Sequence, residues 1–302
     1  MTQNVAASVR QRLLNRSREE GRPFQELLQF FVMERFLYRL SRSRHADRFV
    51  LKGALMLQVW ESPQSRPTRD IDMLGRIEND PDALLEQIRE VLATDGGPDG
   101  IEFDLDSLEA GPITADAEYQ GVRLLGWAYL AGARARLQVD VGFGDAVRPE
   151  PVRSAYPVLL DLPAPELLCY SRESAIAEKF QIMVSRGELN SRMKDFFDIW
   201  LLCRQFDFDV ETLAEAIRAT FEQRDTALRE RPLFSDRFRQ DTQRAWAAFV
   251  DRLGDAVPIE REFGNVLKVL EEFLGGPMDH LAERPLAEAW TAGRWTPFGN
   301  GR

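Results

Sequence analysis

Apolar residues recur three and four positions apart along much of this chain, which is the spacing of an amphipathic helix. Over residues 24–41 the apolar side chains share one helical face: Phe24, Leu27, Leu28, Phe31, Phe36 and Leu40. The same spacing predicts helices over residues 5–18, 81–93, 173–185, 191–206, 209–223, 237–253 and 258–274. After residue 275 the pattern weakens, and we expect little regular structure there.

A different pattern, with apolar residues at every second position, appears between residues 70 and 143. It is clearest over residues 133–143, where Leu137, Val139 and Val141 alternate with polar residues, and it predicts a half-buried strand. Strands are also predicted over residues 70–74, 101–108 and 122–130. The Ala131-Gly132 link predicts a hairpin between residues 122–130 and 133–143.

Together the two patterns predict an α+β fold, with a strand-containing head near residues 45–150 and a helical part after residue 165. We expect four segments: basic N-terminal helices packed on the core (1–48), an α+β domain (49–150), a helical domain (165–275) and a C-terminal tail (276–302). The boundary is expected near residues 147–165, where prolines cluster.

The composition fits a soluble globular protein, because 44% of the 302 residues are hydrophobic and 29% are charged. We expect a cytoplasmic protein without a membrane partner, because no apolar run would span a bilayer and the amino terminus lacks a secretory signal. Cys169, Cys203, His45 and His280 are isolated from one another in sequence, so a structural zinc site is not expected.

Charge is distributed unevenly along the chain. Residues 1–52 contain eleven Lys or Arg and five Asp or Glu, although the whole chain has a net charge of −10. A basic end on an acidic body is compatible with a local surface for a polyanion such as RNA. From charge alone, a set of solvated arginines on two helices is the better-supported interpretation.

The strongest chemical signal is the pair of aspartates in Asp70-Ile71-Asp72. On a strand, residues i and i+2 face the same side, with Cα atoms about 6.5–7 Å apart. Two carboxylates this close repel each other unless a cation or a proton lies between them, and carboxylate oxygens are good Mg²⁺ ligands. The motif by itself is weak, because most such pairs are exposed residues of loops or edges.

Two further residues strengthen the motif. Gly53 begins an apolar segment in which residues 54–59 would form a helical turn or two, and a glycine there lets backbone amides approach a phosphate. Asp140 lies in the apolar run Leu137-Gln138-Val139-Asp140-Val141, where an acid commonly has a partner or a ligand. The alternative for Asp140 is an ordinary residue on the solvent face of an alternating strand.

The order of these motifs resembles that of a known family. The chain has Gly53-Ala54, then Arg66 and Asp70-Ile71-Asp72, then Lys179 on a predicted helix, and finally the segment Arg192-Met193-Lys194-Asp195-Phe196-Phe197-Asp198. This pattern, over about residues 48–203, is similar to polymerase-beta-type nucleotidyltransferases and, more narrowly, to the AbiEii/MenT toxin family. The resemblance implies a polymerase-beta-type head with a mixed sheet and a helical domain that completes the active site.

The resemblance also implies roles for individual residues. Asp70 and Asp72 would bind Mg²⁺ or Mn²⁺, with Asp140 as a third metal ligand or as the general base of the wider superfamily. Lys179 would contact the phosphates of the nucleoside triphosphate (NTP), and Asp195 or Asp198 would orient Lys179. An interhelical cluster of salt bridges without a ligand is the alternative for these last three residues.

Three other positions are expected near the phosphates. Gly53 and Ala54 would shape the phosphate-binding turn, although the family has a second glycine or a serine where this chain has Ala54. Arg66 and Arg69 would neutralise the triphosphate or bind RNA, and a solvated loop is an equally good interpretation for both. A phosphate on Thr68, two residues before Asp70, would weaken metal binding.

The function implied by the resemblance is that of a toxin-like enzyme of a toxin–antitoxin system. It would transfer nucleotides from an NTP to an RNA acceptor, the 3′ end of tRNA, and would have a cognate antitoxin as partner. Two alternatives remain open at this stage: a nucleotidyltransferase that modifies a small molecule or a protein, and a non-catalytic nucleotide-binding module. The sequence does not indicate which NTP is used.

Overall fold

The computed structural model describes residues 4–62, 68–113, 121–228, 234–253, 259–284, 288–291 and 293–296. The chain divides into two compact units, one formed by residues 1–144 and 152–169 and the other by residues 145–151 and 170–302. None of the described helices combines the length and the apolar composition needed to cross a membrane.

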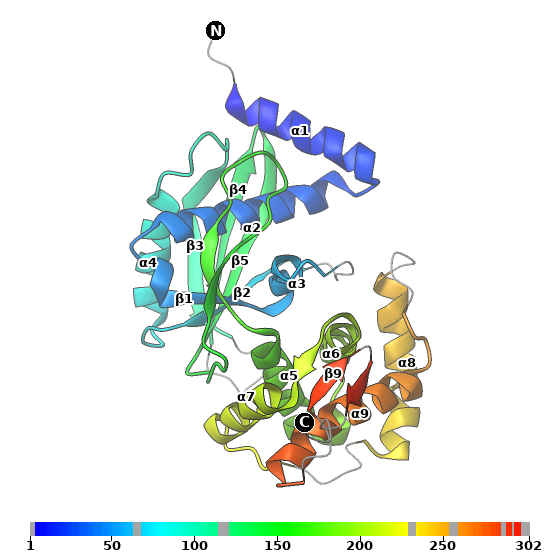
Figure 1. The fold of residues 1–302 in the computed structure, drawn as a ribbon. Coiled ribbons are helices and arrows are strands. Elements are labelled where there is room, and N and C mark those ends of the chain that lie inside the picture. Colours follow the sequence, from blue (N-terminus) through cyan, green and yellow to red (C-terminus); the bar gives the residue numbers. More distant parts are fainter. Residues whose placement is uncertain are drawn as a thin grey trace, which may run out of the picture. The chain divides into compact units, whose positions relative to one another are not determined.

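The first unit contains the α+β head (Figure 1). Its helices are α1 (Val5–Glu20), α2 (Phe24–Arg42), α3 (Met56–Val59) and α4 (Pro81–Ala93), with 3-10 turns at Ala46–Arg48 and Gly53–Leu55. Its strands are β1 (Phe49–Lys52), β2 (Ile71–Gly75), β3 (Glu102–Pro112), β4 (Val122–Leu130), β5 (Ala133–Phe143), β6 (Val152–Ala155) and β7 (Glu166–Cys169).

Within the described ranges, these strands form one seven-stranded sheet in the order β3-β4-β5-β2-β1-β7-β6. The pairs β2–β5 and β1–β7 are parallel, whereas the other neighbours are antiparallel. The mixed sheet expected for the head is therefore confirmed. The β2–β5 pair, which carries the candidate acids, lies in the interior of the sheet rather than at an edge.

One face of the sheet packs against helices. α2 packs against β5 and β7, and α4 packs against β3 and α2. The alternation predicted for residues 133–143 explains the packing, because Leu137, Val139 and Val141 are fully buried in the core that α2 and α4 share. α4 begins as the sequence indicates, since the Asp80 side chain accepts hydrogen bonds from the backbone at Asp82 and Ala83.

Three strands of this sheet lie outside the sequence prediction. β1, β6 and β7 each have four residues, which is too short for an alternating pattern to stand out. β7 is held by parallel pairing with β1, more than a hundred residues earlier in the chain, where Val50 is opposite Leu168 and Leu51 opposite Cys169. The prolines of residues 147–165 therefore lie between strands and do not end the first unit.

The second unit is mainly helical. Its helices are α5 (Arg172–Arg186), α6 (Met193–Gln205), α7 (Val210–Gln223), α8 (Asp236–Leu253) and α9 (Phe263–Leu281), with a 3-10 turn at Gly187–Leu189. Three short strands, β8 (Phe208–Asp209), β9 (Ala289–Thr291) and β10 (Arg294–Thr296), form a small sheet in the order β10-β9-β8. The helices described in this unit all match predicted segments, although the small sheet has no sequence pattern of its own.

Helix α9 runs seven residues beyond its predicted end at residue 274 and contains Pro277. Glycine and proline usually end a helical pattern. Here Gly276 lies against the indole of Trp295, and a Cβ at this position would be 2.4 Å from the Trp295 ring. The packing of β10 on the helix therefore overrides the local preference of the sequence.

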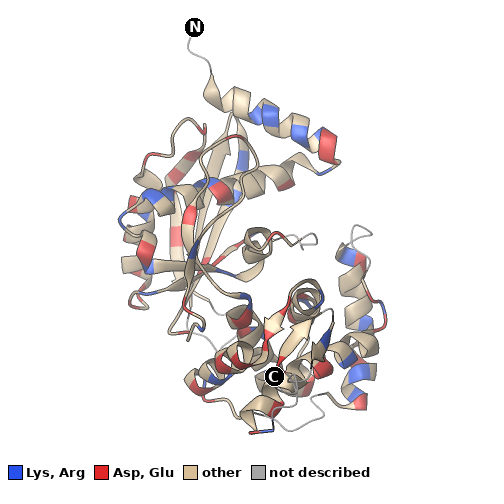
Figure 2. Cartoon of the chain, viewed as in Figure 1, with Lys and Arg blue, Asp and Glu red and all other residues tan. Residues whose placement is uncertain are grey.

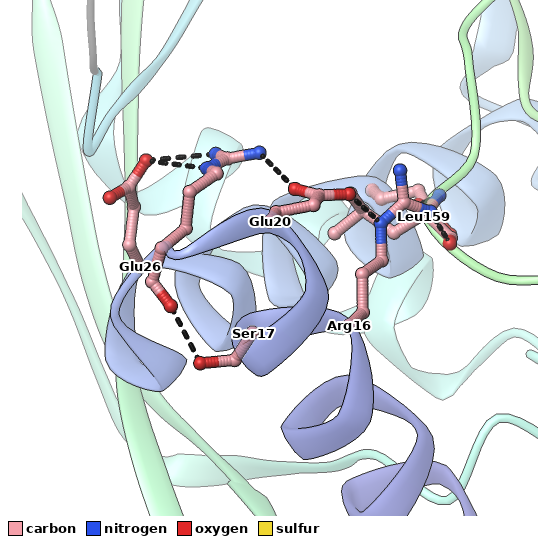
Figure 3. Close-up of polar contacts among 7 residues, drawn as sticks. Arg16, Ser17, Glu20, Glu26 and Leu159 are labelled. Carbon is pink, nitrogen blue, oxygen red and sulfur yellow. Dashed lines mark hydrogen bonds and ion pairs between the residues drawn. The ribbon is translucent and has the colours of Figure 1, made fainter.

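Basic residues lie along the N-terminal helices (Figure 2), and several of them pair with acids within the first unit. Arg16 on α1 bonds to Glu20 and to the carbonyl of Leu159, as Figure 3 shows. Arg39 on α2 is buried and forms two hydrogen bonds to Asp99, at 2.6 and 3.2 Å. These arginines stabilise the packing of α1 and α2, in contrast to the solvated side chains that charge alone suggests.

Glu34 on α2 is a buried acid that makes stability depend on pH. Its side chain is 1% exposed, accepts a hydrogen bond from the backbone of Leu159 and lies 2.9 Å from the Arg35 guanidinium. Burial raises the pKa of Glu34 from 4.5 to about 7, although Arg35 acts in the opposite direction. The folded chain thus keeps a proton that the unfolded chain releases between these two pH values.

Because the folded state binds more protons in this window, the free energy of unfolding should fall as the pH rises from about 4.5 to about 7, by about 3 kcal/mol. Glu34→Gln should remove this part of the pH dependence, and the exposed-site control Glu19→Gln should retain it. Urea unfolding at pH 5 and pH 8 measures the difference. Equal slopes in wild type and Glu34→Gln would show that Glu34 is ionised throughout.

Candidate active site

Strand β2 presents the two aspartates of the sequence motif. Ile71 and Met73 are fully buried in the core, so the residues that alternate with them, Asp70 just before β2 and Asp72 within it, belong to the opposite face. Both aspartates are half-buried. The hydroxyl of Thr68, itself only 9% exposed, donates a hydrogen bond to the carboxylate of Asp70.

The sheet register brings Asp140 beside this pair. Asp72 on β2 is directly opposite Asp140 on the parallel strand β5, and on its other side is opposite Lys52 at the end of β1. Asp140 is in turn opposite Arg123 on β4. Because opposed residues project to the same face, Lys52, Asp72, Asp140 and Arg123 form one row across four strands.

Asp70, Asp72 and Asp140 form a group that suits a hard cation. One carboxylate oxygen from each lies within 4.8 Å of the others. Oxygens that share one Mg²⁺ at 2.0–2.1 Å are at most about 4.2 Å apart, so small side-chain rotations would bring all three onto one ion. The donor set and its spacing therefore fit Mg²⁺ or Mn²⁺.

Arg123 is a site residue that the sequence analysis missed. Its Nε and Nη2 atoms donate to the two oxygens of Asp140 at 2.8 and 2.7 Å, and Gln138 lies 3.3 and 3.4 Å from the same oxygens. The hydrogen bond to Asp140 raises the pKa of Arg123, with further contributions from the charges of Asp140, Asp70 and Asp72. The guanidinium therefore interacts with all three acids.

A signal for Arg123 was present in the sequence. The Ala131-Gly132 loop places Leu130 opposite Ala133, and this register then pairs Arg123 with Asp140. Counting outward from a two-residue hairpin loop would have found the pair.

Gly53 lies directly against Asp72. It has a φ of +72°, and a Cβ built at this position would lie 2.0 Å from Oδ2 of Asp72. A glycine is therefore required by both backbone conformation and space. Ala54 is buried in the 3-10 turn and lacks a positive φ, so the alanine at the second position of the family motif causes no backbone strain.

Of the two loop arginines in the sequence prediction, the structure describes only Arg69. Arg69 is exposed, and its backbone carbonyl accepts a hydrogen bond from Gln29. Arg66 lies outside the described residues. Their suggested contacts with phosphate or RNA remain predictions.

The second unit brings together the other three predicted residues. Lys179 on α5 lies 3.2 Å from Asp195 and 2.7 Å from Asp198, both on α6. Arg192 also contacts Asp195, at 2.6 Å. Asp195 and Asp198 are the two acids whose three-residue spacing puts them on one helical face, and both are buried.

Asp195 stays ionised despite its burial. Burial alone would raise the pKa of Asp195, but the charges of Lys179 and Arg192 and a hydrogen bond from Arg192 hold it below its usual value. Lys179 is therefore a structural partner of the two buried acids, whatever else it contacts.

This pairing predicts a stability effect for Lys179→Met. The change removes the cation that Asp195 and Asp198 share, and breaking a buried ion pair commonly costs about 3–5 kcal/mol. Lys194→Met, at an exposed position of the same helix α6, should change stability by less than about 0.5 kcal/mol. Urea unfolding measures both, and equal midpoints for the two variants would contradict the prediction.

The fold is similar to that of solved structures. A crystal structure described as that of a "putative nucleotidyltransferase from H. pylori" aligns with a TM-score of 0.50 at 15% identity, covering 85% of this chain and 97% of that chain. The JHP933 protein of Helicobacter pylori aligns with a TM-score of 0.49 at 15% identity, covering 86% of this chain and 95% of that chain. A comparison with curated proteins gave no match.

The family follows from the sequence itself. A family model described as nucleotidyl transferase AbiEii toxin, type IV TA system, matches residues 35–269. The chain belongs to this AbiEii family of nucleotidyl transferase toxins, as its motifs indicated. Membership implies a nucleotide substrate and an antitoxin partner.

Proposed function

We propose that the chain is a metal-dependent nucleotidyltransferase that adds nucleotides from an NTP to an RNA acceptor, the 3′ end of tRNA. The observation that carries the proposal is the convergence of Asp70, Asp72 and Asp140 on one face of the sheet, with carboxylate oxygens within 4.8 Å. In a family of nucleotidyl transferase toxins, such a group is best explained as the site of a catalytic cation.

Asp70 and Asp72 are the residues that would hold the cation. Thr68 fixes the Asp70 carboxylate by a hydrogen bond, and Gly53 leaves room for the carboxylate of Asp72. A bound divalent cation would neutralise phosphate charge, and a pair of such ions would stabilise both the attacking and the leaving oxygens. Asp140 would add a third oxygen ligand or accept the proton of the acceptor hydroxyl.

The remaining predicted residues would act on the nucleotide. Lys179 is proposed to contact the NTP phosphates, with Asp195 and Asp198 fixing the position of its ammonium group. Gly53 and Ala54 would form the turn that approaches the phosphates, and Arg66 and Arg69 would offset triphosphate or RNA charge. These roles rest on the matching positions of the family motifs.

A cationic small molecule or a protein is a second candidate acceptor. The observation that favours it is the acidity of the chain, with a net charge of −10 and a sequence pI of about 5.0. The structure adds that Arg16 and Arg39 of the basic segment pair with acids of the chain. RNA remains the first candidate because the protein belongs to a family of nucleotidyl transferase toxins.

A transfer assay tests the proposal. The purified chain is incubated with Mg²⁺, total tRNA, cell protein and each α-labelled NTP in turn, and the products are separated into RNA, protein and small-molecule fractions. Label in tRNA with one NTP is the expected result. Label only in the protein or small-molecule fraction would show that the acceptor is a protein or a small molecule and not tRNA. No label in any fraction, together with no NTP binding, would overturn the enzymatic function.

A further inference from the structure

Arg123 donates a hydrogen bond to each oxygen of Asp140, the third carboxylate of the candidate metal site. Its planar fork takes one oxygen of Asp140 with Nε and the other with Nη2, at 2.8 and 2.7 Å. This is the bidentate geometry in which arginine and carboxylate bind most strongly. A cation that takes Asp140 as a ligand must therefore either use the remaining lone pairs of these oxygens, close to the positive charge of Arg123, or draw one oxygen away from Arg123.

The Arg123–Asp140 ion pair can separate when a cation binds Asp140. The Asp140 side chain is 13% exposed, whereas the Arg123 side chain is 38% exposed at the next position of the row. The guanidinium can therefore leave the carboxylate without being stranded in an apolar core. The cost of separating the pair is moderate, because Arg123 regains contact with water.

The positive charge of Arg123 stabilises the group of three carboxylates. Three carboxylates within 4.8 Å repel one another, and a fixed positive charge beside them offsets part of this repulsion when no cation is bound. The raised pKa of Arg123, caused first by its hydrogen bond to Asp140 and then by the charges of Asp140, Asp70 and Asp72, reflects the same attraction. The guanidinium thus carries out part of the task of a metal ion.

We propose that Arg123 is a positioning residue that competes with the divalent cation for Asp140, so that the empty site is pre-formed but binds metal weakly. This inference rests on the metal site of the proposed function. It predicts that Arg123 sets the affinity of the chain for the cation through Asp140, in the absence of any nucleotide.

The experiment measures Mn²⁺ binding alone by electron paramagnetic resonance and calorimetry, with the full chain and no NTP or acceptor. Arg123→Gln removes the charge and the fork, and should bind Mn²⁺ about tenfold more tightly than wild type, because a unit charge beside a partly exposed divalent ion has an effect of this size. Arg123→Lys keeps the charge but loses the fork, and should fall between the two.

Two further variants separate the mechanism from a general change in surface charge. Arg136→Gln removes an exposed arginine on the same sheet face, four residues from Asp140 along β5 or about 13 Å, and should change the affinity less than twofold. In an Asp140→Asn background, Arg123→Gln should have a smaller effect than in wild type, because the carboxylate for which Arg123 and the metal compete is gone and only the charge of Arg123 still acts on the ion.

The outcomes distinguish this inference from the proposed function. If Asp72→Asn weakens Mn²⁺ binding but Arg123→Gln leaves it unchanged, the metal site stands and the competition is overturned. The competition is also overturned if the gain from Arg123→Gln is as large in the Asp140→Asn background as in wild type. If no form of the chain binds Mn²⁺, the metal site itself is wrong. Nucleotide transfer is absent from all of these measurements, so the acceptor can be misassigned without affecting them.

Discussion

Asp72→Asn is expected to lower nucleotide transfer by on the order of 10³-fold while the chain remains folded. Asparagine has nearly the shape of aspartate, so the close contact with Gly53 is kept. The change removes one of the three charges that would bind the cation. A loss of this size corresponds to about 4 kcal/mol of transition-state stabilisation, which is what a metal ion contributes to phosphoryl transfer.

The measurement is the rate of label transfer from the NTP that wild type uses, at saturating acceptor, with circular dichroism and thermal unfolding to verify the fold. Asp106→Asn is the matched control, because it removes one negative charge at an exposed position of β3 in the same sheet. It should transfer label at the wild-type rate within about twofold. A folded Asp72→Asn protein that retains more than a tenth of the activity would remove Asp72 from the catalytic group.

The acids of this site could be found from the sequence because strand geometry is local. Alternation placed Asp70 and Asp72 on one face, and the apolar neighbours of Asp140 placed it on a half-buried strand. What alternation leaves open is the order of the strands. Only the parallel pairing of β2 with β5 puts Asp72 opposite Asp140, and that pairing joins segments about seventy residues apart.

The burial of arginines in the basic N-terminal segment could not be predicted from charge. A count of arginines cannot distinguish a solvated side chain from one that is buried with a partner. Arg39 pairs with Asp99 and Arg35 is fully buried beside Glu34, so part of the basic segment belongs to the interior. Partners this far apart in sequence, such as Arg39 and Asp99, have no shared local pattern.

For the helical unit, the sequence predicted the positions of the site residues but not their contacts with a ligand. The three-residue spacing of Asp195 and Asp198 correctly placed both on one helical face, and the interhelical salt bridges considered for Lys179 are present. Sequence spacing gives no information on whether Lys179 also contacts the nucleotide. The stability effect predicted for Lys179→Met therefore has to be separated from any effect on transfer.

Gly53→Ala is expected to lower transfer by at least about a hundredfold through the position of Asp72. An added Cβ would lie 2.0 Å from Oδ2 of Asp72, so the carboxylate must move by more than 1 Å to reach an ordinary contact distance. A displacement of about 1 Å in a catalytic group commonly costs about 10²-fold in rate. The φ of +72° adds about 1–2 kcal/mol of backbone strain.

Gly132→Ala separates the strain from the displacement. Gly132 has a φ of +81° in the β4–β5 hairpin, nothing lies within 4 Å of an added Cβ there, and the residue is eight positions, or about 26 Å, from Asp140 along the strand. Both variants should therefore lose similar stability in urea, whereas only Gly53→Ala should lose transfer and Mn²⁺ binding. If the two lose transfer equally, general destabilisation explains the effect, and the need for glycine beside Asp72 is one of backbone conformation alone.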